Sequence, residues 1–155
     1  MPFEELAGDA RALAAALRPL EAVTEQFLVP DDCLPAECDE ALAALNVLSR
    51  PAGRMLRLLK QSRQYPPALA LNRFDLLASL RFIETKSLEA QMEIGRFRLV
   101  CQEWNPQTTH QRMAIRRRLE MLVEVGGEVS DKVLRLLETF PVPSRPLVRA
   151  QRRTI

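Results

Sequence analysis

The chain is poor in the residues that usually build an active site or a metal site. Its 155 residues include one histidine, His110, and three cysteines, Cys33, Cys38 and Cys101. A structural zinc site takes four donors from such residues, and these few are scattered along the sequence. The sequence also lacks a Gly-rich phosphate loop and an HExxH pair. We therefore expect a protein that is not an enzyme and holds neither a metal ion nor a cofactor.

Long apolar runs are absent as well. No window reaches the about 18 apolar residues that a membrane-spanning helix needs. The first residues carry acids where a secretory signal has a basic region followed by an apolar one. An odd number of cysteines argues against a disulfide framework, although the spacing leaves a Cys33–Cys38 bridge open. We expect a soluble cytoplasmic protein with reduced thiols.

Glycine and aromatic residues are scarce, whereas leucine, alanine and arginine recur throughout. The chain has five glycines and 5% aromatic residues, with no strand-like alternation. This mixture favours helix, and 47% hydrophobic with 27% charged residues is typical of a globular protein. We predict an all-α fold, a bundle of five to seven helices with one long central helix. Residues 1–140 form the predicted single domain, and 141–155 an extended or disordered basic tail.

Proline, glycine and capping residues set the predicted helix boundaries. Proline suits the first turn of a helix and disrupts its interior, and glycine commonly ends a helix. Asparagine, serine and threonine are the usual N-cap residues. The predicted boundaries are a kink or break at Pro19, an end near Ser49, a new helix at Pro51, N-caps at Asn72 and at Thr108 or Thr109, an end or bend at Gly126 and Gly127, and a last helix capped by Ser130.

The longest predicted helical stretch covers residues 72–104. Its apolar positions alternate in steps of four and three over about four heptads, which is typical of a bundle helix or a coiled coil. Thr85 or Ser87 could instead cap a new helix and divide the stretch in two. The predicted buried seam is Leu76, Leu80, Ile83, Ser87, Ala90, Ile94, Phe97, Cys101 and Trp104.

A second, thinner apolar stripe follows the same stretch. It consists of Leu77, Leu88, Met92 and Leu99, which are the candidate partner-binding residues. Two stripes on one helix indicate two apolar neighbours. The interior of the bundle could supply both neighbours, or the second could be another chain.

The net charge of +2 hides a strong asymmetry along the chain. Residues 1–50 have three basic and ten acidic side chains, which gives a net charge of −7. Residues 51–155 have 19 basic and 10 acidic side chains, which gives a net charge of +9. Residues 41–74 contain no acid at all. Such polarity can be satisfied within one fold, between subunits or by a polyanion.

Basic residues form three clusters along the sequence. If these clusters share one face, binding to nucleic acid with a steep salt dependence follows. Against this, aromatic residues for base stacking are few, and Arg116 can pair with Glu120 one turn on. The candidate polyanion-binding residues are Arg50, Arg54, Arg57, Lys60, Arg63, Arg116, Arg117, Arg118, Arg149, Arg152 and Arg153.

The sequence therefore predicts a non-enzymatic adaptor, chaperone-like or regulatory module, which binds a protein partner or itself, as a homodimer or larger, through amphipathic helices. The alternative is a nucleic-acid-binding protein that uses the basic helix 50–63, Arg116–Arg118 and the tail. A second alternative is a self-assembling subunit, in which the acidic N-terminal part of one copy meets the basic part of the next. No small-molecule substrate is evident in the sequence.

Overall fold

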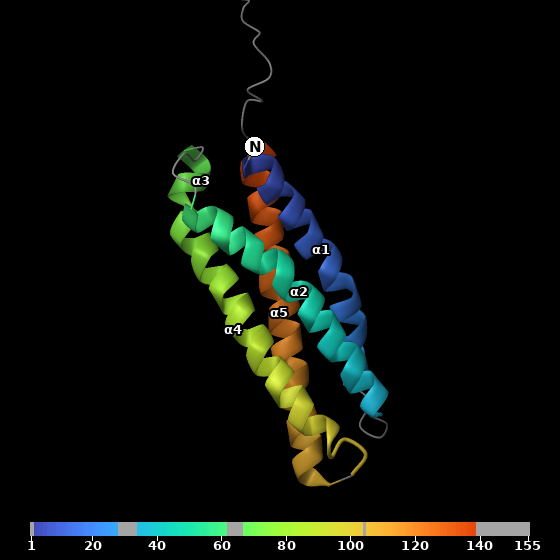
Figure 1. The fold of residues 1–155 in the computed structure, drawn as a ribbon. Coiled ribbons are helices and arrows are strands. Elements are labelled where there is room, and N and C mark those ends of the chain that lie inside the picture. The colour runs from blue at the N-terminus through green and yellow to red at the C-terminus, as the bar shows by residue number, and fades with distance from the viewer. Residues whose placement is uncertain (1, 28–33, 62–66, 104, 139–155) are drawn as a thin grey trace, which may run out of the picture.

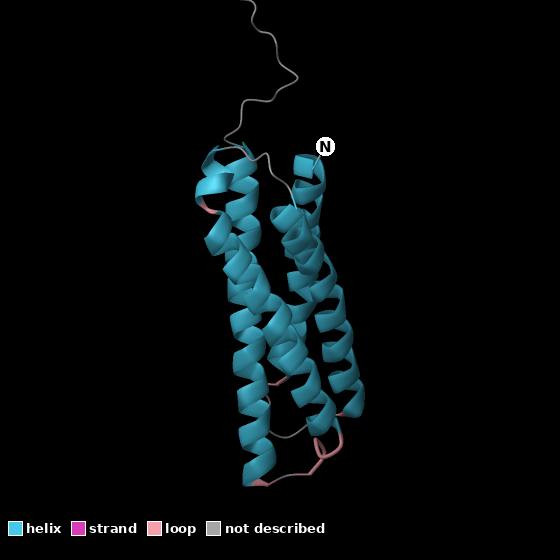
Figure 2. Ribbon diagram, turned by 60° about the vertical axis from the view of Figure 1, so that its left-hand side comes forward, coloured by secondary structure: helices cyan, strands magenta, loops and turns pink. Residues whose placement is uncertain are grey.

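The structure is a computed structural model that describes residues 2–27, 34–61, 67–103 and 105–138 (Figure 1). These residues form five helices: α1 (Pro2–Gln26), α2 (Pro35–Gln61), α3 (Pro67–Leu71), α4 (Arg73–Arg98) and α5 (Pro106–Glu138). The four long helices run alternately down and up, and no strand occurs among the described residues (Figures 1 and 2). The predicted all-α bundle of five to seven helices is confirmed.

Each long helix contacts two neighbours. The contacts join α1 to α2, α2 to α4, α4 to α5 and α5 back to α1. Within the described residues the backbones of the diagonal pairs, α1 with α4 and α2 with α5, do not approach each other closely, and Figure 1 shows α5 behind α2. The result is a four-helix bundle in which α1 and α5 form one face and α2 and α4 form the opposite face.

The predicted seam of α4 faces the core. Its members from Leu76 to Cys101 are all buried, and Trp104 lies outside the described residues. Ser87, the one polar member, is fully buried and its Oγ donates a hydrogen bond to the Leu45 carbonyl of α2 at 3.4 Å. Neither Thr85 nor Ser87 divides α4, which is one helix from Arg73 to Arg98.

Helix α2 runs without interruption through Pro51, so the predicted end near Ser49 is wrong. An interior proline costs a helix about 3 kcal/mol. The apolar stripe continues across it, however, because Leu48, Ala52 and Met55 are fully buried. Burial of one large apolar side chain contributes about 1.5–3 kcal/mol, so packing against the neighbouring helices outweighs the local penalty. Pro19 likewise lies inside α1.

Helix α5 runs through Gly126 and Gly127, so the predicted end or separate last helix is wrong. Ser130 does not cap a helix, since its hydroxyl donates to the Gly127 carbonyl within α5. The packing explains Gly126: a Cβ there would lie 2.8 Å from Leu17 Cδ2 of α1. Glycine at this position lets α1 and α5 approach closely rather than ending the helix.

The capping residues differ from the predicted ones. Asn105, rather than a threonine, precedes α5: its Oδ1 accepts a hydrogen bond from the Thr108 backbone N–H at 2.9 Å. The Thr108 hydroxyl accepts from the Asn105 N–H in return, which makes a reciprocal cap. Asn72 precedes α4 as predicted, but its side chain makes no cap and donates to the Ala68 carbonyl instead.

Two arginines tie α2 to α4. Near the start of α4, Arg73 donates to the Leu59 and Lys60 carbonyls in the last turns of α2. At the other end of α4, Arg98 makes two hydrogen bonds, of 2.7 and 3.1 Å, to the carboxylate of Asp39. These hydrogen bonds from Arg98 hold the pKa of Asp39 below its ordinary value of 3.8.

The two glycines of α5 provide a test of the continuous helix. Gly127→Ala is expected to raise the free energy of unfolding by about 0.5–1 kcal/mol, because alanine is the better helix former and its Cβ meets no atom within 4 Å. Gly126→Ala is expected to gain less or to lose stability, because Leu17 has to move. Urea unfolding followed by circular dichroism measures both, and equal losses for the two variants would contradict a helix that continues through this pair.

An NMR pH titration of the carboxyl groups tests the contact between Asp39 and Arg98. Asp39 is expected to titrate below 3.8 and to return toward that value in Arg98→Gln. The pKa of Glu89 is lowered mainly by a hydrogen bond from Lys86, so it should stay low in this variant. Because the folded-state pKa of Asp39 is lowered, its contribution to stability is present above 3.8 and is lost as pH falls through the lowered value.

Candidate interaction surface

The outer side of α4, together with its C-cap residue Leu99, carries a row of exposed apolar side chains, which we name the α4 ridge. Its members are Phe74, Leu88, Met92 and Leu99, with exposed fractions of 83%, 60%, 60% and 79%. At about 100° per residue they lie within about 40° of one another, opposite the buried seam. From end to end the ridge spans about 37 Å at 1.5 Å per residue.

The α4 ridge differs from the predicted stripe at one end. Leu88, Met92 and Leu99 are exposed as the prediction requires, but Leu77 is only 6% exposed and belongs to the core. Phe74 takes its place on the surface, and sequence reasoning did not single it out. The available signal was spacing, because Phe74 stands two heptads before Leu88 and therefore on the same row.

Exposed apolar residues are ordinary when they are scattered singly. Here they share one helix face, which is typical of a binding surface. The middle of the face is polar, since the exposed Arg81 and Thr85 separate Phe74 from Leu88. Arg96, also exposed, lies between Met92 and Leu99. The surface is therefore apolar with interspersed cations.

A groove of about 500 Å³ runs between α2 and α4 beside the ridge. We name it the arginine groove. Glycine at position 53 leaves space between α2 and α4, because a Cβ at this position would lie 3.3 Å from Glu84 Oε2. Leu88 belongs to both the ridge and the groove, so the apolar and basic surfaces adjoin. The groove is lined by Ser49, Arg50, Gly53, Arg54 and Arg57 of α2 and by Glu84, Thr85 and Leu88 of α4.

Most of the cations on this part of α2 have no ion-pair partner among the described residues. Arg54 is the exception, with its Nε 2.9 Å from Asp9 Oδ1 of α1. Arg50, Arg57 and Lys60 are exposed and form no ion pair with the described part of the chain. They remain free to meet an external anion.

The cluster Arg116–Arg118 lies on α5, diagonally across the bundle from α2, so the structure does not bring these two basic clusters together. Two of its members are already paired. Arg118 contacts Glu89 at 2.9 Å and Glu93 at 3.0 Å, which joins α5 to α4, and Arg116 contacts Glu120 at 3.1 Å. Arg117 alone points to solvent without an ion pair in the described residues. The candidates Arg63, Arg149, Arg152 and Arg153 lie outside the described residues.

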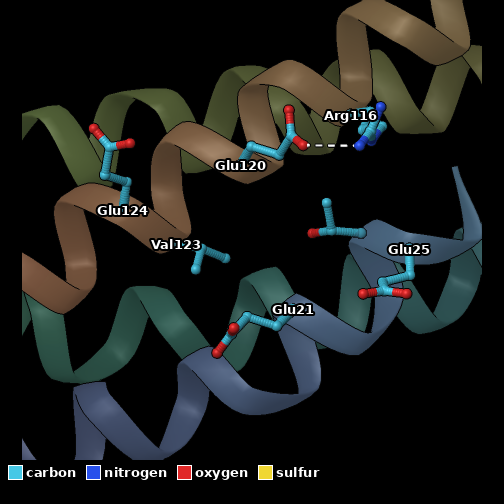
Figure 3. Close-up of a pocket in the computed structure, with 7 residues that line it drawn as sticks. Glu21, Glu25, Arg116, Glu120, Val123 and Glu124 are labelled. Atoms are coloured by element: carbon cyan, nitrogen blue, oxygen red, sulfur yellow. Dashed lines mark ion pairs between the residues drawn. The ribbon is translucent and has the colours of Figure 1, made fainter. Parts of the chain in front are cut away.

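A second groove, of about 250 Å³, lies between the side chains of α1 and α5 on the opposite face of the bundle (Figure 3). We name it the glutamate groove. Figure 3 shows Glu21 and Glu25 of α1 across from Glu120 and Glu124 of α5, with the ion pair between Arg116 and Glu120 at one end. Sequence reasoning missed this site. Each pair of glutamates is spaced one turn apart in the sequence, but only the contact between α1 and α5 joins the two pairs.

Of the residues weighed for chemistry, Cys33, and with it the open Cys33–Cys38 bridge, lies outside the described residues. His110 is exposed near the start of α5, whereas Cys38 and Cys101 are buried. Across the described ranges, no group of three or more His, Cys, Asp or Glu side chains is placed to hold a metal ion. In the same part of the chain, no helix is long and apolar enough to cross a lipid bilayer.

Comparison with known proteins gives no further assignment. No protein-family model, no curated protein and no solved structure matches this chain.

Proposed function

We propose that this chain is a non-enzymatic interaction module that binds an α-helical segment of a protein partner across its α2–α4 face. The observation that carries the proposal is the α4 ridge, whose large apolar side chains stay exposed beside the arginine groove. An adaptor, chaperone-like or regulatory role fits such a module, because each works through binding rather than chemistry.

The bundle does not need the ridge for its own core. The buried seam of α4 already packs between α2 and α5, and the ridge points the opposite way. No described helix covers it. A helix laid along the α2–α4 face would bury apolar side chains against Leu88 and Met92, in the manner of helix-in-groove recognition.

The charges on this face define the partner. Arg50 and Arg57 border the groove on α2, while Arg81 and Arg96 lie among the apolar residues of α4. Complementary charge sets the register and the choice of partner more than it sets affinity. We therefore expect the bound helix to be amphipathic, with acidic residues beside its apolar stripe.

Substitution of the ridge tests this proposal. The double variant Leu88→Glu, Met92→Glu is expected to retain its helix content and thermal midpoint, because both side chains are 60% exposed, and to lose partner binding. A matched control is Gln107→Glu, Met113→Glu, which adds the same charge at two exposed positions near the start of α5, with Met113 49% exposed. Quantitative mass spectrometry of proteins retained from an extract of the expressing cells, compared among wild type and both variants, measures the binding.

The expected result is a set of proteins retained by the wild type and the α5 control and lost with the ridge variant. If the ridge variant retains the same proteins as the wild type, the α4 ridge is not the binding surface. Loss with both double variants would mean that added negative charge, rather than the ridge, determines retention.

A second candidate function, polyanion binding, rests on the unpaired cations of α2. Arg50, Arg57 and Lys60 supply up to three contacts to phosphate or sulfate groups. Arg116 and Arg118 are engaged with glutamates, so the described residues offer one basic cluster rather than two joined ones. Binding through this cluster would be weak and of modest salt dependence.

Heparin affinity tests this second function. Three contacts predict a slope of log affinity against log salt no steeper than about −3, at about 0.9 per contact. Arg50→Gln, Arg57→Gln is expected to remove most of the retention, whereas Arg117→Gln, an exposed cation on α5, should leave it nearly unchanged. Equal loss in both variants would indicate a diffuse charge effect without a site.

A further inference from the structure

Two ridges of opposite charge occupy diagonal corners of the bundle. The basic ridge on α2 consists of Arg50, Arg54, Arg57 and Lys60, and the acidic ridge on α5 consists of Glu120, Glu124, Glu128 and Asp131. All eight side chains belong to exposed residues. The backbones of α2 and α5 do not approach each other closely within the described residues, and no ion pair there joins the two ridges, so neither ridge neutralises the other inside one molecule.

Both ridges are largely unpaired. On the basic ridge only Arg54 has an ion-pair partner among the described residues, and on the acidic ridge only Glu120 has one. Within each ridge the like charges stand three or four residues apart, where they repel one another. Contact with a surface of the opposite charge would relieve this repulsion.

The two ridges match in length and in composition. The basic ridge spans about 15 Å and the acidic ridge about 17 Å at the standard helical rise. Each ridge therefore carries four charges over nearly the same distance. The surroundings also match, because Met121, 50% exposed, accompanies the acids and Leu88, 60% exposed, lines the arginine groove.

We propose that the partner of the α2–α4 face is a second copy of this chain, whose α5 acidic ridge lies along the basic ridge and arginine groove of the first. This inference rests on the proposed function and names its partner. Since the two ridges are different surfaces, the contact is heterologous and leaves one basic and one acidic ridge free on every pair. Copies therefore add head to tail into open chains or closed rings.

A protein partner fits this face better than a nucleic acid does. A phosphate backbone would satisfy Arg50 and Arg57 but would leave Leu88 and Met92 without an apolar counterpart. The α5 face of a second copy supplies both kinds of contact, because Met121 lies among the acids.

Solution mass tests the inference directly. Nuclease-treated, purified protein in low salt is expected to show a weight-average mass above that of the 17.6 kDa monomer, increasing with concentration. The mass should return to the monomer value at about 1 M salt, where the Debye length falls to about 3 Å. Sedimentation velocity and light scattering measure this. A monomer at every concentration in low salt would overturn the inference, as would assembly that disappears once nucleic acid is removed.

Two variants, each lacking the charges of one ridge, identify the surfaces through which the copies bind. Arg50→Gln, Arg57→Gln disables the basic ridge, and Glu124→Gln, Glu128→Gln disables the acidic ridge, with exposed neutral side chains that leave the core untouched. Each variant alone is expected to be monomeric. An equimolar mixture is expected to form a 1:1 dimer and stop there, because each pair joins the one intact basic ridge to the one intact acidic ridge.

The outcomes separate this inference from the proposed function. A mixture that stays monomeric, or either variant assembling alone like the wild type, overturns head-to-tail assembly. Should self-association fail while the wild type still retains proteins that the variant Leu88→Glu, Met92→Glu loses, the α4 ridge binds a different protein and the proposed function stands. Failure of both measurements removes the α2–α4 face as a binding surface altogether.

Discussion

Burial of the α4 seam between α2 and α5 is the contact on which the rest of the structure depends. Leu80, Ile83 and Ile94 are fully buried, and each such side chain contributes about 1.5–3 kcal/mol. The seam also determines the rotation of α4 about its own axis. Because the opposite side of the helix must then face outward, the same constraint that forms the core exposes Leu88 and Met92 and produces the α4 ridge.

The same packing decides where helices end. Pro51 and Gly126 satisfy local rules for a break, yet α2 and α5 continue through them. Local rules count the penalty of the residue itself, about 3 kcal/mol for an interior proline and about 1 kcal/mol for a glycine. They leave out the free energy gained when apolar residues on both sides of that residue are buried, which requires a continuous helix. Where that burial exceeds the penalty, the break predicted from sequence does not form.

The placement of charged side chains on the bundle likewise depends on tertiary structure and not only on their order in the sequence. The opposite net charges of residues 1–50 and 51–155 predict polarity along the chain, but the bundle arranges charge by face. The acidic ridge on α5 comes from the part of the chain with a positive balance. Its Glu120 and Glu124 lie across the glutamate groove from Glu21 and Glu25 of α1, whereas Arg118 of the same helix forms ion pairs with Glu89 and Glu93 of α4.

The amino-acid sequence by itself determined the helical class, the buried seam of α4 and the acid-free basic stretch of α2, because these depend on residue type and on spacing within one helix. Only the tertiary structure decided that Leu77 is buried, since it lies between the inner and outer sides of α4 and the neighbouring helices determine whether it is covered. It also decided that α2 and α5 stand diagonally apart. The relative placement of helices arises from contacts between residues distant in the chain, which no local pattern encodes.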